Sequence, residues 1–160
     1  MLFAGLVAVM QFGWSSARDT SLERLIIDDM TVKPAAWLIN HLTPEVKVLA
    51  EGNRLKAAGG GINVRKGCEG AEVIIMLTAA MMVAQLQIKW RLLGILTGSI
   101  AILICNQIRI LAMFYVNRSD KALFDLLHGI VAPVVLILIA TGFFIFWLDY
   151  FGVRQDWERL

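Results

Sequence analysis

Long apolar runs dominate this chain and alternate with short polar segments. Ala71–Ile88, Leu92–Val116 and Ile130–Leu148 approach or exceed the ~20 apolar residues that a helix needs to span a bilayer. Residues 1–17 form a weaker run of the same kind. The pattern therefore predicts an all-α membrane protein with about four transmembrane helices, near residues 1–17, 71–88, 92–116 and 129–148.

The first apolar run has two readings. A cleaved secretory signal peptide usually begins with positive charge, and no Lys or Arg precedes this run. We therefore expect a retained first span. The small residues Ser15–Ala17 before Arg18 keep a cleavage site open as the alternative.

Residues 18–67 are predicted to form a small extramembrane segment between spans one and two. Arg18–Leu42 carries apolar residues at helical spacing, so it is either a helix along the membrane surface, anchored by Trp37, or a loop helix packed on the spans. Glu45–Gly67 contains short β-prone pieces separated by turn signals, which indicate a β-hairpin or an extended meander.

Composition supports a single membrane domain of 160 residues. Apolar residues make up 58% of the chain and charged residues 18%, with a mean hydropathy of +0.69, which is outside the range of soluble domains. The net charge of +2 and the lack of a basic stripe with aromatics speak against a nucleic-acid partner. The two cysteines have no CxxC or HxxxH context, so we expect no metal and no cofactor.

A buried arginine is the strongest candidate for function. Arg109 lies inside the third predicted span, where a cation costs about 2.5–3.5 kcal/mol on insertion scales. It is tolerated when it faces a protein interior and meets an anion, a hydroxyl or developing negative charge. The alternative is an arginine that only holds helices together.

The order of the spans brings three reactive side chains to one membrane face. A tight turn is expected at Gln87–Arg91, and a short polar loop at Asn117–Leu127 on the opposite face. Cys68 then opens span two and His128 opens span four on the same side. Arg109 lies about 10 Å deep on that side, because it stands seven residues from the end of its span.

These three groups suit acyl transfer on a peptide bond. A thiol is nucleophilic as the thiolate, which a neighbouring cation or a helix N-terminus favours, and Cys68 is expected at such a position. Histidine can take the thiol proton and return it to a leaving amine. Arginine can donate hydrogen bonds to a tetrahedral oxyanion. The alternative is that Cys68 and His128 are ordinary packing and polar residues.

Three local sequences resemble the exosortase/archaeosortase family. They are Cys68-Glu69-Gly70, Asn106-Gln107-Ile108-Arg109-Ile110 and Leu127-His128-Gly129, and they lie within residues 64–148. They match the family's ordered pattern of a Cys-x-Gly, an Asn-x-x-Arg and a His. The small number of spans resembles the short, exosortase H type, because many family members have around eight.

The resemblance implies a function and a set of site residues. Members of the family are thought to be cysteine transpeptidases that process exported proteins carrying a C-terminal sorting signal of a short motif, a membrane span and a basic cluster. Carried to matching positions, it implies Cys68 as nucleophile, Arg109 and His128 completing the catalytic site, and Asn106 supporting it. The expected partners are a tagged exported protein and the lipid bilayer.

Two acidic residues close to Cys68 affect the predicted site. Glu69 stands where the family more usually has a small or neutral polar residue, and a carboxylate there disfavours a thiolate unless it points to water or pairs with Arg65 or Lys66. Glu72 either supports the site, by pairing with Arg109 or orienting His128, or is an acid favoured by the helix N-terminus.

Two further residues are competitors for the same roles. Cys105 lies about 6 Å deeper in the membrane than Arg109, so we expect it to serve packing and not to reach Cys68 for a disulfide. His41 lies in the extramembrane segment and is expected at the surface. It is the only other histidine and thus the only competitor to His128 as the base.

The positive-inside rule and the family resemblance predict opposite orientations in the membrane. Arg18–Gly70 holds eight Lys and Arg, against four on the opposite face, so the positive-inside rule places the Cys68 face in the cytoplasm. The resemblance places this face outside, at the outer (periplasmic) side of the cell's inner (plasma) membrane, and we expect that orientation. Two other functions stay open from the residues: a non-enzymatic assembly or transporter subunit with a structural polar cluster, and a lipid-modifying acyltransferase.

Overall fold

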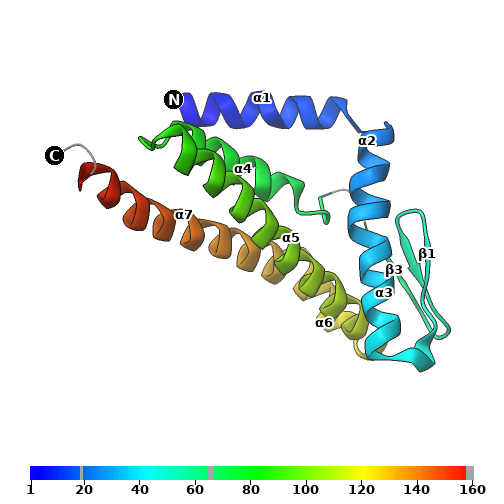
Figure 1. The fold of residues 1–160 in the computed structure, drawn as a ribbon. Helices are drawn as coiled ribbons and strands as arrows, with labels where there is room; N and C mark the ends of the chain where they lie inside the picture. The colour runs from blue at the N-terminus through cyan, green and yellow to red at the C-terminus, as the bar shows by residue number, and fades with distance from the viewer. Residues whose placement is uncertain (19, 65–66, 158–160) are drawn as a thin grey trace.

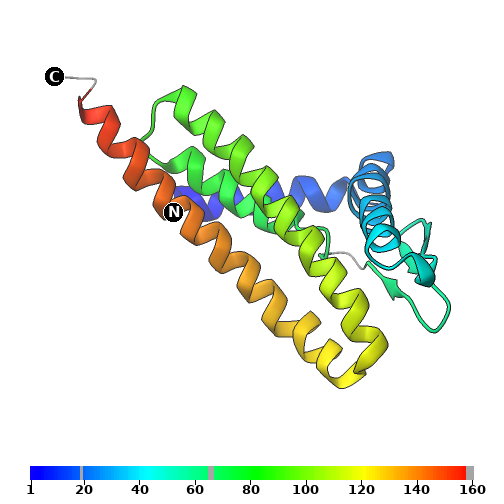
Figure 2. The same cartoon turned by 60° about the horizontal axis from the view of Figure 1, so that its bottom comes forward.

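The computed structural model describes residues 1–18, 20–64 and 67–157. Three helices lie lengthwise beside one another, namely α4 (Ala71–Val83), α5 (Ile88–Ser119) and α7 (Ala132–Trp157), and α1 (Leu2–Ser16) packs on α4. The chain reverses between α4 and α5 and again between α5 and α7 (Figures 1 and 2). Helix α4 contacts all three others, so it is the centre of the bundle.

Two helical runs are long and apolar enough to cross a membrane. Ile88–Ser119 and Lys121–Gly152 each have 32 residues, with mean hydropathies of 1.8 and 2.6 in their most apolar windows. Only 28% and 11% of these windows are buried within the protein, so most of the apolar surface faces outward. That surface suits contact with lipid.

The other two predicted spans are shorter helices. Helix α1 has 15 residues and α4 has 13, below the ~20 residues of a full span. Helix α4 ends at Val83 because Ala84 adopts an extended backbone, whereas the apolar run continues to Ile88. The length of the apolar run therefore overestimated this helix, and the structure does not confirm four spans. The tight turn expected at Gln87–Arg91 is also wrong in position, because the chain turns at residues 84–87 and α5 begins at Ile88.

Close packing of α5 against α4 and α7 depends on two glycines. A Cβ atom on Gly98 would lie 2.5 Å from Leu77 Cδ2 and 2.7 Å from Phe143 Cε1. A Cβ atom on Gly94 would lie 2.6 Å from Trp147 Nε1. Small residues four apart let helices approach closely in membranes, and here they form a seam between three helices.

A continuous helical segment crosses one end of the bundle at a steep angle (Figure 1). It comprises α2 (Ser21–Arg24), the π-helical turns Leu25–Val32 and α3 (Lys33–Leu42). One face is buried against α5 and the sheet, while the Trp37 side chain is exposed. The segment thus packs on the bundle, and its contact with a membrane surface stays a prediction.

Beside this segment lies a three-stranded antiparallel sheet. Its strands β1 (Leu49–Glu51), β2 (Arg54–Lys56) and β3 (Ile62–Asn63) lie in the order β1-β2-β3. Leu55 of the middle strand is 1% exposed and packs in the core that also holds Phe114 of α5. The meander is therefore confirmed as the form of the expected β structure.

The C-terminal end of α5 is tied to the sheet. The Asn117 side-chain amide donates to the Gly61 carbonyl at 3.1 Å, and Arg118 donates to the carbonyls of Ala58 at 2.8 Å and Gly60 at 3.3 Å. These bonds explain why α5 continues to Ser119 instead of ending near Val116.

The expected polar loop at Asn117–Leu127 is wrong, because almost all of it is helical. Asp120 alone separates α5 from α6 (Lys121–Leu126), and α6 continues through π-helical residues Leu127–Val131 into α7. The Asp120 carboxylate accepts hydrogen bonds from the backbone of Ala122 and Leu123. This N-cap starts a new helix within one residue.

Candidate functional site

The site is built around the loop that delivers the chain to α4. Cys68 stands in this loop between Gly67 and Gly70, whose φ angles of +90° and +82° lie in the left-handed region. A Cβ atom on Gly70 would also come within 3.3 Å of Asn106 Cγ. Glycine at position 70 therefore serves both the turn and the close approach of the loop to α5.

Asn106 of α5 connects this loop to the helix by a hydrogen bond. Its side chain is 1% exposed, and its Nδ2 donates to the Cys68 carbonyl oxygen at 3.0 Å. Its Oδ1 accepts from Arg109 Nη1 at 3.5 Å. A single buried amide thus connects the backbone of Cys68 to the guanidinium one helical turn away.

The Cys68 sulfur contacts side chains from two other helical segments. Its Sγ lies 3.7 Å from His128 Nε2 and 3.9 Å from Arg109 Nη2. Cys68 is half-buried, as are the two partner residues. The structure therefore brings together four of the five predicted site residues, namely Cys68, Asn106, Arg109 and His128.

His128 is placed by an irregular helical turn. It belongs to the π-helical residues Leu127–Val131, and its ring stacks on Phe124 with the centroids 5.3 Å apart and the planes 9° apart. Single π-turns inside helices often occur at functional sites. Here the turn and the stacked ring together fix the direction in which the imidazole faces.

Arg109 lines an apolar pocket and also contacts the thiol. A pocket of about 250 Å³ lies between α5 and α7, with Arg109 and Cys105 among its otherwise apolar lining. Among the described residues, Arg109 forms no salt bridge. Its second guanidinium nitrogen lies 3.9 Å from the sulfur, so the cation is oriented toward the thiol.

The Glu69 side chain was expected either to point to water or to pair with a neighbouring cation, and it does not point to water. It is 1% exposed, and its Oε2 is buried without a hydrogen-bond partner in the described part of the chain. The alternative pairing involves Arg65 and Lys66, which lie outside the described residues.

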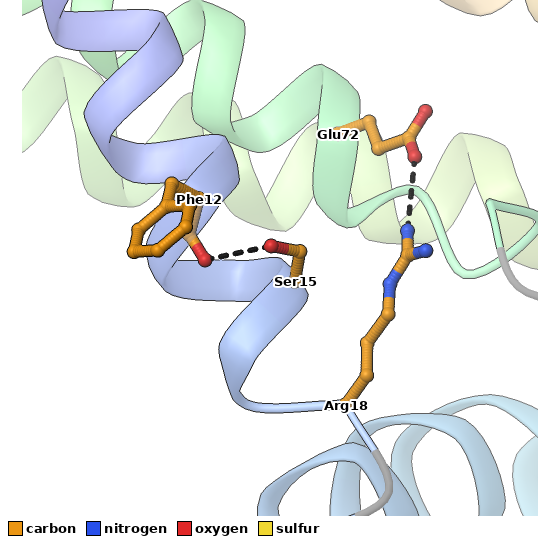
Figure 3. A network of polar contacts seen from close by, with 4 residues as sticks. All are labelled: Phe12, Ser15, Arg18 and Glu72. Atoms are coloured by element: carbon orange, nitrogen blue, oxygen red, sulfur yellow. Dashed lines mark hydrogen bonds and ion pairs between the residues drawn. The ribbon is translucent and has the colours of Figure 1, made fainter.

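Glu72 is the predicted site residue that lies elsewhere. Its Oε1 is 3.4 Å from Arg18 Nη2, and both side chains are partly exposed, at 43% and 31% (Figure 3). Arg18 follows α1, whose last turn includes a hydrogen bond from Ser15 to the Phe12 carbonyl at 2.8 Å. Glu72 thus connects α4 to the end of α1, and no contact with Arg109 or His128 is present among the described residues.

The two competitors are separate from this cluster. His41 is exposed on α3, where its Nδ1 lies 3.0 Å from the Trp37 carbonyl and its ring contacts the indole. Cys105 packs against the apolar cluster of the bundle. No disulfide joins either cysteine to another among the described residues.

The sequence did not reveal a second, polar pocket beside His128. Asn63, Asn117, Phe124 and Asp125 line it together with His128, in a volume of about 220 Å³. The i to i+4 spacing of Phe124 and His128 on one helix was a usable signal, but the expected loop at Asn117–Leu127 concealed it. The position of Asn63 depends on where the sheet packs. The local sequence predicted β structure there but not its location beside His128.

The fold and site define a largely helical membrane protein with a thiol, an imidazole and a guanidinium gathered at one end. The family model described as "Transmembrane exosortase (Exosortase_EpsH)" matches residues 1–152. The chain therefore belongs to the transmembrane exosortase family. No curated protein matches it, and neither does any solved structure.

Proposed function

We propose that this exosortase is a membrane-embedded cysteine transpeptidase or protease that cuts exported proteins at a C-terminal sorting signal. The observation that carries the proposal is the pair of contacts on one sulfur, 3.7 Å to His128 Nε2 and 3.9 Å to Arg109 Nη2. A thiol used only for packing needs neither contact. Membership of the transmembrane exosortase family is in keeping with this role.

In the first step, His128 Nε2 accepts the Cys68 proton and the thiolate attacks the carbonyl carbon of the scissile peptide bond. The carbonyl oxygen becomes an oxyanion, to which the Arg109 guanidinium donates hydrogen bonds. His128 then returns the proton to the leaving amine, the C–N bond breaks and a thioester to Cys68 remains. Attack by water or another amine on the thioester releases the product and restores the thiol.

Asn106 is a positioning residue in this scheme. It holds the Cys68 carbonyl and the Arg109 guanidinium at once, so it fixes the separation between nucleophile and oxyanion donor. Buried amides with both ends bonded are rigid, which suits a site that must be organised before substrate arrives.

For the membrane, we propose that the Cys68 end faces the outside of the inner membrane, where exported substrates arrive. The short helices α1 and α4 complete the bundle at membrane depth, with the exposed apolar side chains of α1 toward lipid. A membrane-impermeant thiol reagent added to intact cells should then label Cys68 and leave Cys105 unlabelled. Labelling of Cys68 only after the inner face is exposed would reverse the orientation.

The catalytic proposal is tested by Cys68→Ala beside Cys105→Ala, each at matched membrane abundance. The reporter is an exported domain fused to the C-terminal motif, span and basic cluster of an exported protein from the same genome. Cys68→Ala should leave it unprocessed, while Cys105→Ala should process it normally. Normal processing by Cys68→Ala would refute the proposal, whereas loss of the folded protein would support a purely structural cluster.

A further inference from the structure

The free edge of the sheet lies against the polar pocket beside His128. Strand β3 is the last strand in the order β1-β2-β3, so one side of its backbone has no neighbouring strand in the part of the chain that the structure describes. Gly61, Ile62 and Asn63 form one wall of the pocket, and Asn117, Phe124, Asp125 and His128 form the rest. An open strand edge and the proposed acid–base residue therefore share one cavity.

The register shows which backbone groups face this cavity. Leu55 pairs with Ile62 and Arg54 with Asn63, and the Val64 N–H donates to the Asn53 carbonyl at 2.8 Å. In an antiparallel pair, hydrogen-bonded residues alternate with non-hydrogen-bonded ones. Val64 and Ile62 thus face β2, whereas the N–H and C=O of Asn63 face away from it.

The neighbouring residue on the same edge confirms this direction. Gly61 also faces away from β2 by the same alternation, and its carbonyl accepts from the Asn117 side chain at 3.1 Å. Asn117 thereby covers the edge at Gly61. Within residues 1–18, 20–64 and 67–157, no backbone partner covers it at Asn63, five residues before Cys68. The open groups lie on the side of β3 that faces the pocket.

We propose that this pocket binds the extramembrane peptide segment next to the scissile bond, in an extended conformation, as a fourth strand on β3. The inference rests on the proposed peptidase function. One residue of the substrate would exchange two backbone hydrogen bonds with Asn63, as added strands do in β-augmentation. The carboxylate of Asp125, exposed at the pocket wall, would accept from a hydrogen-bond donor on a substrate side chain.

This arrangement fits the chemistry that the site must perform. Backbone pairing holds a peptide extended, so its carbonyl groups are presented at regular intervals along the edge. Because His128 belongs both to the pocket and to the thiol contact, a strand bound at Asn63 leads directly to Cys68. Specificity for a short motif then comes from the side-chain lining, and affinity comes from the backbone.

The test is Asn63→Pro, with Ala50→Pro as the matched control. Proline removes the backbone N–H, and Asn63 does not use this group within the sheet, so the strand tolerates it as an edge position. Ala50 is the outward-facing residue of the other edge strand, β1, since it pairs with Leu55, whose groups bond to Ile62. The two variants impose the same backbone change on opposite edges.

Two readouts separate binding from chemistry. The first is processing of the reporter with the C-terminal motif, span and basic cluster. The second is alkylation of Cys68 by iodoacetamide in the purified full-length protein, which needs no peptide. Asn63→Pro should lower processing by about tenfold. Its alkylation rate, and both readouts of Ala50→Pro, should stay within about twofold of the wild type.

A second variant tests the proposal independently of Asn63→Pro. Asp125→Ala changes an exposed side chain, and it should also lower processing without changing alkylation. Normal processing by both Asn63→Pro and Asp125→Ala would overturn the strand-addition proposal, as would an equal fall in alkylation and processing. Failure of the peptidase function itself is distinguishable, because Cys68→Ala would then process the reporter.

Discussion

The two halves of helix α5 show two different ways to hold helices together. In the half near the α4–α5 turn, Gly94 and Gly98 allow Trp147, Leu77 and Phe143 to pack directly against the helix backbone. In the other half, Asn106, Gln107 and Arg109 extend to different partners: the Cys68 loop, the carbonyls of Met30 and Thr31, and the Cys68 thiol.

The difference shows which contacts can orient a side chain and which only keep helices together. Apolar packing at the glycine seam fixes distance but tolerates small rotations, because dispersion forces have no preferred angle. A polar group in an apolar environment must instead meet a partner at defined geometry or lose several kcal/mol, about 2–7 by transfer measurements. The polar half of α5 can therefore position a reacting group, and the seam serves to keep α5 in place.

The largest expected effect concerns the base of the polar half. His128→Ala should slow processing by about 10²–10⁴-fold, the usual contribution of general acid–base catalysis, because no other imidazole contacts Cys68 among the described residues. His41→Ala is the control, and it should process at the wild-type rate. Rates are measured on the reporter at matched membrane abundance. Equal effects of the two substitutions would contradict the role given to His128.

The next effect concerns the shape of the cation. Arg109→Lys keeps the charge but loses the planar fork that contacts Asn106 and the Cys68 sulfur together. We expect processing to fall by about 10²–10³-fold, as for loss of an oxyanion donor, with membrane abundance unchanged. Wild-type processing by the lysine variant would show that a point charge suffices.

The smallest effect concerns the seam. Gly98→Ala places a methyl group against Leu77 and Phe143, and overpacking of this kind costs about 1–3 kcal/mol. Thermal stability in detergent should fall, while processing per folded molecule should persist. Gly142→Ala on α7 is the control, because its added methyl group meets no atom within 4 Å. If Gly98→Ala abolished processing without loss of stability, the separation of the two halves would be wrong.

The sequence predicted the parts of this molecule whose signal is local. The apolar runs of α5 and α7 are long and apolar enough to cross a membrane, and an arginine in the middle of such a run is costly. Both spans and the importance of Arg109 therefore follow from transfer energies. Cys68, Asn106 and His128 were predicted with help from the family resemblance. Their meeting at one end also required a turn between α4 and α5. The sequence predicted a turn here but placed it a few residues too late, because residues 88–91 already form the first turn of α5.

The features that the sequence did not predict depend on tertiary contacts, which a local sequence pattern does not encode. Asn117 and Arg118 look like loop residues, but bonds to the sheet turn keep them helical. Glu72 has the helical spacing to face the site, yet Arg18 at the end of α1 pairs with it. Asn63 became relevant only through the strand register, which is set by long-range pairing.

The most direct test of the central claim is whether substrate becomes covalently attached to Cys68. The protein is incubated with the reporter, quenched in acid and digested, and the cysteine peptides are identified by mass spectrometry. A thioester between the upstream part of the reporter and Cys68, released by hydroxylamine and not found at Cys105, is the predicted result. Processing of the reporter with no such thioester at any time point, and with full retention of activity in Cys68→Ala, would contradict the account.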